Sequence, residues 1–187
     1  MNKKATKIIG ILLIIIAVIG SFMFMKLSNA AVISNNDSNG IKWSFEISGS
    51  NAINVFYSSG TLTDKLEIPS TLTYNNNTYT VTSIKKKSGS NGGSNGINIF
   101  PDTASKNQIK ELVIPDTVQT IGMAAFMGCS NLEKVTFGSG IETIERNAFY
   151  NCSKITEINL GDNVKTIGAL AFYNTRPTEF VMPDSVT

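Results

Sequence analysis

Hydrophobic residues recur at an interval of 23 residues through the second half of the chain. Ile121 is followed by Ile144 and then Ile167, and the residues around each of them repeat in the same order. The last copy, which contains Phe180, arrives one residue early. A fixed period of about 20–30 residues with apolar positions in register indicates a solenoid, in which each repeat forms one coil. The positions that we expect to stack as ladders in its core are Ile121, Ile144, Ile167, Phe126, Phe149, Phe172, Cys129 and Cys152.

The spacing within one repeat predicts its local structure. Val135 and Phe137 are two residues apart, so in a short strand both point inward while Thr136 points outward. A turn follows, and two of the repeats begin it with Pro-Asp, because proline presets φ and cannot donate to a strand ladder. A second short segment carries the inward isoleucine, and Ala125-Phe126 closes a tight helical or 3-10 turn. One such unit cannot bury its apolar groups alone, so stacked copies must share a core.

The segment from Leu112 to Leu132 reads Leu-Val-Ile-Pro-x-x-Val-x-x-Ile-Gly-x-x-Ala-Phe-x-x-Cys-x-x-Leu. This pattern resembles the bacterial surface leucine-rich repeats of the BspA and Treponema pallidum type, over residues 109–187 and in part over residues 41–84. The resemblance implies a β-rich leucine-rich-repeat solenoid with short helical or 3-10 turns, a parallel β-ladder on the concave face and a β-hairpin N-terminal cap. It also implies secreted or cell-surface proteins used for attachment, including binding of host matrix proteins, and it carries no catalytic residues.

The composition of the chain predicts several segments. A basic start and an uncharged run over residues 8–25 are typical of a signal peptide or of an uncleaved N-terminal membrane anchor, and either places the rest of the chain outside the cell. The last repeat stops before its expected Ile-Gly, so we expect a truncated piece of a longer protein, with end-to-end stacking as the alternative. The segments are residues 1–30 (leader), 31–40 (spacer), 41–84 (β-rich N-terminal cap and first repeat-like segment), 85–96 (flexible inserted loop) and 97–187 (about 3.5 repeats, the last incomplete).

The cap and the inserted loop follow from local patterns. Trp43 and Phe45 alternate with Ser44 and Glu46, which predicts a half-buried strand, and residues 53–57 predict the returning strand of a hairpin. In the loop, three lysines precede a run of glycine, serine and asparagine, which indicates a solvated insertion in preference to a basic finger for an acidic partner. We expect the phenylalanine just after the loop, at position 100, to replace the repeat phenylalanine.

Charge and residue content exclude several functions. The chain has a net charge of +2, but four lysines lie in the leader, so 12 bases and 14 acids remain beyond it. That balance argues against nucleic-acid binding, which needs a basic stripe. Histidine is absent, which excludes Ser-His-Asp and Cys-His catalysis and every histidine-containing metal site. We expect no enzyme activity, no cofactor and no bound metal, and membrane contact only through residues 8–25.

Cys129 and Cys152 occupy the same place in adjacent repeats, which leaves two interpretations. The first is a pair of buried free thiols stacked in a ladder, since free cysteine is among the most buried residue types. The second is a disulfide between coils, which an oxidising exterior permits. Stacked equivalent side chains run parallel, whereas a disulfide needs converging Cβ vectors, so the geometry favours the free thiols.

The residues that alternate with the core positions form the candidate binding surface. They should present a mixed-charge strip on the concave face, and extended strips of this kind are how repeat proteins bind partners. We expect a protein partner, for example from the host extracellular matrix, or a cell-wall component. The alternative is a passive spacer or scaffold module of a larger extracellular protein whose activity lies in a missing C-terminal part. The strip residues are Lys110, Glu111, Val113, Glu133, Lys134, Thr136, Thr156, Glu157 and Asn159.

Overall fold

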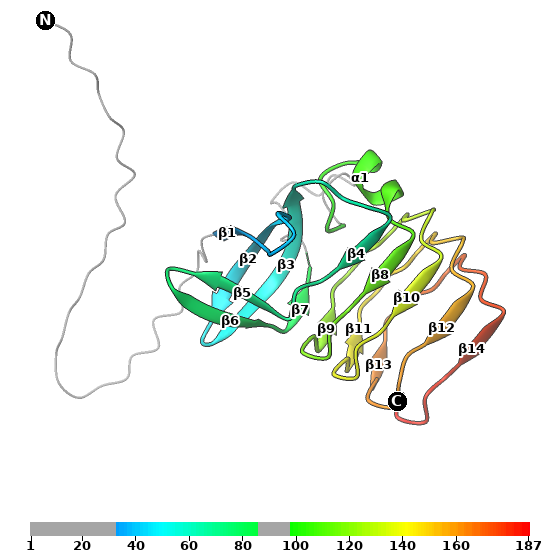
Figure 1. Cartoon of the computed structure of the whole chain (residues 1–187). Coiled ribbons are helices and arrows are strands. Elements are labelled where there is room, and N and C mark those ends of the chain that lie inside the picture. Colours follow the sequence, from blue (N-terminus) through cyan, green and yellow to red (C-terminus); the bar gives the residue numbers. More distant parts are fainter. Residues whose placement is uncertain (1–32, 86–97) are drawn as a thin grey trace, which may run out of the picture.

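The computed structural model of the chain describes residues 33–85 and 98–187. The leader predicted for residues 1–30 and all but the first residue of the loop predicted for residues 85–96 lie outside these described residues. The described part is a stack of coils with a group of antiparallel strands at its N-terminal end (Figure 1). It is rich in strands and has few helices, so the predicted class of repeat solenoid is confirmed.

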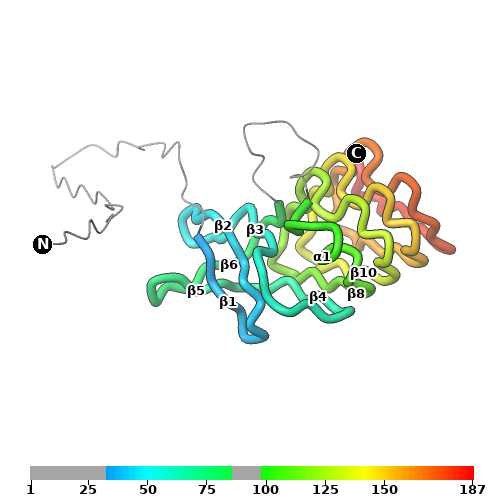
Figure 2. The backbone as a smooth tube through the Cα atoms, turned by 90° about the horizontal axis from the view of Figure 1, so that it is seen from above, coloured from blue at the N-terminus to red at the C-terminus, as the bar shows by residue number. Residues whose placement is uncertain are grey.

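The first strand of each coil belongs to one parallel sheet, in the order β14-β12-β10-β8-β4. Leu66 pairs with Leu112, and Leu112 pairs with Val135, so equivalent residues lie side by side. These three side chains are buried, and the sheet thereby covers one side of the core. Seen from above, the coils follow one another from the cap to the C-terminal end (Figure 2). The strands are β4 (Lys65–Glu67), β8 (Glu111–Val113), β10 (Lys134–Thr136), β12 (Glu157–Asn159) and β14 (Glu179–Val181).

A second parallel ladder is made of two-residue strands. Ile84 pairs with Ile121, Ile121 with Ile144, and Ile144 with Ile167. The ladder begins in the cap, because Val55 pairs with Ile84 in the same direction. Four of these side chains are fully buried, so the isoleucine ladder and the cap share one core. They are Val55, Ile84, Ile121 and Ile144. The strands are β7 (Ser83–Ile84), β9 (Thr120–Ile121), β11 (Thr143–Ile144) and β13 (Thr166–Ile167).

A row of aromatic rings connects the cap to the repeats. The Trp43 ring meets the edge of Tyr57 with centroids 6.4 Å apart, and Tyr57 lies 5.9 Å from Phe100. From there the row continues through the repeat phenylalanines, with centroids 6.5 Å apart between Phe100 and Phe126 and 5.1 Å apart between Phe126 and Phe149. Such ring pairs stabilise a core beyond their buried area, so cap and coils are packed as one body.

The turn that carries the repeat phenylalanine differs from the predicted helical or 3-10 form. Ala124, Asn147 and Leu170 hold the same place in successive repeats and have φ of 55°, 58° and 59°. A right-handed helix needs negative φ at every residue, so the chain forms overlapping turns here. The backbone bonds to the next coil instead: the Phe126 N–H donates to the Ala148 carbonyl over 2.8 Å.

The N-terminal cap is organised around the predicted antiparallel hairpin of β2 and β3. Strand β1 pairs with β2, so this part of residues 31–40 is sheet, where the sequence predicted a spacer. Strands β5 and β6 form a further hairpin, and β6 pairs with β3 in parallel. These cap strands are β1 (Ile33–Asn36), β2 (Lys42–Ser48), β3 (Asn51–Ser59), β5 (Thr71–Tyr74) and β6 (Asn77–Val81).

Strand β2 is buried on both faces, which corrects the predicted half-buried strand. Ser44 is 4% exposed and Glu46 is 8% exposed. The Ser44 hydroxyl shares hydrogen bonds with Ser34 on β1 and Ser58 on β3. The Asn54 side-chain amide donates to a Glu46 carboxylate oxygen over 3.0 Å. The alternation of apolar and polar residues within β2 does not reveal that side chains of β1 and β3 cover its polar residues.

In the first coil, two consecutive residues share the place that one phenylalanine occupies in each repeat. One supplies the ring and the other supplies the backbone hydrogen bond. Phe100 is buried beside Phe126, as predicted. The backbone position belongs to Ile99, whose N–H donates to the Ala125 carbonyl over 2.9 Å, the same type of bond that the repeat phenylalanines make. A short helix, α1 (Thr103–Gln108), follows, which the repeat pattern does not predict.

Candidate binding face

The outward side chains of β4, β8, β10, β12 and β14 form one exposed surface, which we call the strand face. Each strand contributes its first and third residues, because side chains alternate along a strand. Six of the nine predicted strip residues lie on it, and the other three directly precede strands. Glu111 and Val113 are partly buried, and the remaining seven are exposed. The six are Glu111, Val113, Lys134, Thr136, Glu157 and Asn159, and the three are Lys110, Glu133 and Thr156.

Parallel pairing lines up the first outward residue of each strand in a row. Lys65 pairs with Glu111, Glu111 with Lys134, Lys134 with Glu157, and Glu157 with Glu179. The charge therefore changes sign at each strand until the row ends in two glutamates. Neighbouring strands lie about 4.8 Å apart, so these charges are close to one another. The third residues of the strands are Glu67, Val113, Thr136, Asn159 and Val181.

The pairing between β10 and β12 is shorter than the pairings on either side. Strand β10 pairs with β8 over three residues, and β12 pairs with β14 over three. Between β10 and β12 the pairing covers Lys134 and Glu157 alone. The two strands therefore separate after this pair.

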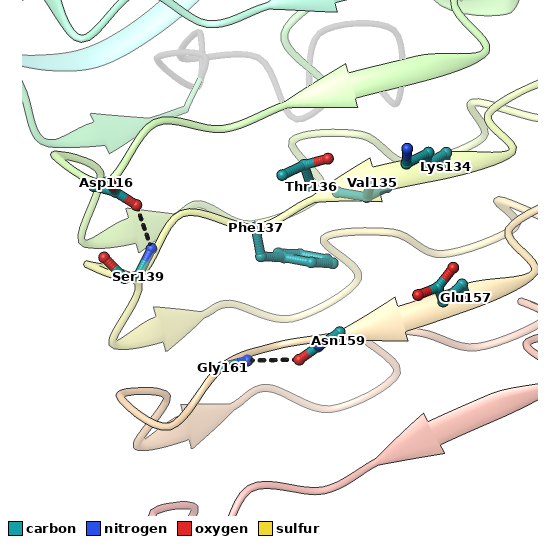
Figure 3. Close-up of a pocket in the computed structure, with 9 residues that line it drawn as sticks. All are labelled: Asp116, Lys134, Val135, Thr136, Phe137, Ser139, Glu157, Asn159 and Gly161. Atoms are coloured by element: carbon teal, nitrogen blue, oxygen red, sulfur yellow. Dashed lines mark hydrogen bonds between the residues drawn. The ribbon is translucent and has the colours of Figure 1, made fainter.

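A hollow of about 420 Å³ lies where β10 and β12 separate (Figure 3). Lys134 and Glu157 stand at one end of it, and the Phe137 ring lies between the strands (Figure 3). This ring packs edge-on against Phe149 and Phe172, with centroids 5.6 Å and 6.4 Å apart. The hollow thus has an aromatic base and a charged rim. Its lining comprises Asp116, Lys134, Val135, Thr136, Phe137, Ser139, Glu157, Asn159 and Gly161.

Asp116 brings a second carboxylate to the hollow from the neighbouring coil. The Ser139 N–H donates to its Oδ1 over 2.7 Å. The Ser139 amide and hydroxyl hold the pKa of the Asp116 carboxyl below its usual value, because they stabilise the ionised form. The hollow is thus lined by two acidic side chains, Asp116 and Glu157, and one basic side chain, Lys134.

Sequence reasoning missed part of this surface. The predicted strip does not include Lys65, Glu67 and Glu179, although the partial match of residues 41–84 to the repeat and the last copy around Phe180 carried that signal. Asp116 was assigned only to a turn, because the separation of β10 and β12, which opens the hollow beside it, is not visible in the repeat pattern.

Both cysteines are free thiols, and both are fully buried. The Cys152 thiol lies 3.2 Å from the Phe126 carbonyl oxygen and donates to it. Burial, and then the neighbouring Cys152, raise the pKa of the Cys129 thiol well above its ordinary value. Cys129 is accordingly kept as the neutral thiol, and both cysteines act as small core residues.

In residues 33–85 and 98–187, no group of three or more cysteine, aspartate or glutamate side chains is placed to hold a metal ion. The same residues contain no helix that is both long and apolar enough to span a membrane.

The repeats match a known family. A family model described as "BspA type Leucine rich repeat region (6 copies)" covers residues 96–187. These residues belong to the BspA-type leucine-rich repeat family. The resemblance seen in the sequence is confirmed, and the hollow lies within the BspA-type region.

Solved structures of leucine-rich repeat proteins share this fold. A leucine-rich repeat protein from Bacteroides ovatus is 28% identical, with a TM-score of 0.61 over 79% of this chain and 35% of that one. The T. pallidum leucine-rich repeat protein TpLRR is 17% identical, with a TM-score of 0.56 over 83% and 60%. A leucine rich cell surface protein from Faecalibacterium prausnitzii is 20% identical, with a TM-score of 0.54 over 84% and 44%.

The chain therefore spans between 35% and 60% of the length of these three structures. A search of curated proteins found no match.

Proposed function

We propose that the chain is a secreted or cell-surface repeat protein that binds other macromolecules through its strand face, as an adhesin for a host matrix or surface protein does. The observation that carries this proposal is the strand face itself: five parallel strands present charged and polar side chains in register, and a hollow opens among them. Extended faces of this kind are how repeat proteins bind partners.

Two further observations support a location outside the cell. Residues 1–30 have the composition of a signal peptide or an N-terminal anchor. The similar protein from Faecalibacterium prausnitzii is described as a cell surface protein. Binding through the strand face requires no catalysis, which fits a chain without histidine.

A second candidate is a passive spacer or scaffold module within a larger extracellular protein. The coverage favours it, because the chain spans only 35% to 60% of the three similar structures described above. A spacer has no partner of its own, so the two candidates differ in whether any macromolecule binds the strand face.

The deciding experiment is a capture assay with the full chain, purified in a mild uncharged detergent, against extracellular matrix proteins and bacterial wall fractions. The test variant exchanges two paired charges on the strand face, Lys134→Glu with Glu157→Lys. The matched control exchanges Glu142→Lys with Lys165→Glu, an exposed pair 3.0 Å apart that does not line the hollow. Neither exchange alters the net charge.

A binder should lose its partner in the strand-face variant and keep it in the control. If the folded wild-type chain captures nothing, the binding function is wrong and the spacer stands. Equal loss in both variants would place the partner elsewhere on the molecule.

A further inference from the structure

The strand face is acidic, and its acids gather toward the last coils. Two outward lysines, Lys65 and Lys134, stand on the five strands. Four outward glutamates oppose them, and the outward residues of β12 and β14 include no base. The outward glutamates are Glu67, Glu111, Glu157 and Glu179.

The lysines of this face leave an excess of negative charge on the last two strands, because Lys134 lies between Glu111 and Glu157, and Glu179 has only Glu157 opposite it. Lys65 forms an ion pair with Glu67 on its own strand, 2.6 Å apart, at the opposite end of the sheet. Glu157 and Glu179 are exposed and directly paired, and within residues 33–85 and 98–187 neither forms an ion pair. Like charges directly opposite each other on neighbouring strands repel, so a cation from outside would stabilise this pair.

The hollow supplies a place for such a cation to enter. Its rim carries two carboxylates, that of Glu157 and, from the neighbouring coil, that of Asp116, against the single ammonium of Lys134. The acidic row and the hollow are separate observations, because the first comes from the residues on the strands and the second from the break in pairing between β10 and β12. Both are centred on Glu157.

We propose that the strand face binds a basic segment of a protein, with one cationic side chain in the hollow beside Glu157 and Asp116 and another over Glu179. This inference rests on the proposed binding function and names the partner's chemistry. Arginine suits the hollow best, since its planar guanidinium donates in a fork to carboxylates and can stack on an aromatic ring such as Phe137. Polyanions, including sulfated polysaccharides and phosphate-rich wall polymers, are repelled by the same charges.

The test measures binding of synthetic peptides to the full chain by fluorescence anisotropy, in an uncharged detergent at low salt. One labelled peptide alternates arginine with serine over about ten residues, which is long enough to cross five strands when extended. A second peptide alternates glutamate with serine, and heparin is the polyanion. The test variant is Glu157→Lys with Glu179→Lys. The matched control is Glu142→Lys with Asp184→Lys, two exposed acids that are not on the strand face.

We expect the arginine peptide to bind wild type, to bind the test variant at least about tenfold more weakly, and to bind the control variant within about twofold. Glu157→Gln with Glu179→Gln should give an intermediate loss, and thermal unfolding verifies that each variant is folded. The inference is overturned if the glutamate peptide or heparin binds more tightly than the arginine peptide, or if the test variant binds the arginine peptide as wild type does.

These outcomes are distinct from failure of the proposed function. A partner from the capture assay that depends on Lys134 and Glu157 but presents an acidic segment would overturn the basic-partner inference and leave the binding function standing. Absence of any captured partner would overturn both.

Discussion

Phe149 and Phe172 are 23 residues apart in the chain, and their rings are stacked with centroids 5.4 Å apart and planes 2° apart. Phe126 stacks on the other face of Phe149, with centroids 5.1 Å apart. Both distances are close to the spacing of about 4.8 Å between neighbouring strands, so the rings follow the period of the coils. Phe149 therefore has a ring on each face and no exposed surface.

Replacement of this central ring should destabilise the whole stack. We expect Phe149→Ala to lower the free energy of unfolding by about 3–5 kcal/mol, because it removes a fully buried aromatic side chain and leaves a cavity. Urea unfolding followed by circular dichroism measures the loss. The control is Tyr173→Ala, whose side chain is 54% exposed and which should cost less than about 1 kcal/mol. Equal losses in the two variants would contradict a core role for the Phe149 ring.

The buried Cys129 thiol makes the stability of the fold depend on pH in the alkaline range. Folding raises the pKa of the Cys129 thiol, so the folded chain keeps a proton that the unfolded chain releases above about pH 8.5. This contribution is complete below that pH and is lost as the pH rises through the folded pKa. We expect the free energy of unfolding to fall from pH 8 to pH 10 more steeply in wild type than in a Cys129→Ala, Cys152→Ala variant. Parallel curves for the two proteins would show that the thiols do not contribute.

Gly140 lies where a neighbouring coil leaves no room for a side chain. A Cβ at this position would overlap the carbonyl oxygen of Asp116, a backbone atom that cannot move alone. We expect Gly140→Ala to cost about 1–3 kcal/mol through forced separation of the two coils. Differential scanning calorimetry measures the change, and Gln119→Ala, at an exposed side chain, is the control with a change within about 0.5 kcal/mol. An unchanged melting temperature in Gly140→Ala would mean that the coils can separate freely.

Leu170 occupies a left-handed backbone position that asparagine occupies one repeat earlier, at Asn147. Its side chain is 48% exposed, so the strained backbone gains little from burial. Asparagine adopts this conformation more readily than leucine, and we expect Leu170→Asn to raise the free energy of unfolding by about 0.5–1 kcal/mol. Leu170→Ala, which keeps a Cβ without the local hydrogen bonding of asparagine, should bring no comparable gain in the same urea titration. A loss of stability in Leu170→Asn would show that packing of the leucine side chain stabilises the fold more than relief of the backbone strain does.

The ladders could be predicted because they depend on spacing alone. Equal intervals between Ile121, Ile144 and Ile167 place one such residue at the same point of every coil, whatever the exact turn geometry. The turns could not be predicted equally well. Hydrophobic spacing does not reveal that Ala124 and Leu170, neither a usual left-handed residue, adopt positive φ, because the bonds to the next coil hold them there.

The sequence by itself determined that the chain stacks its repeats, which residues enter the core, and which side chains alternate outward beside them. A regular interval is enough for this, since every coil then meets an identical neighbour. Only the tertiary structure decided that β10 and β12 separate after Lys134 and Glu157, that Asp116 of one coil lines the resulting hollow, and that Glu179 has only another glutamate, Glu157, opposite it. These features arise where adjacent coils differ, and contacts between unlike neighbours are formed only when the coils are packed together.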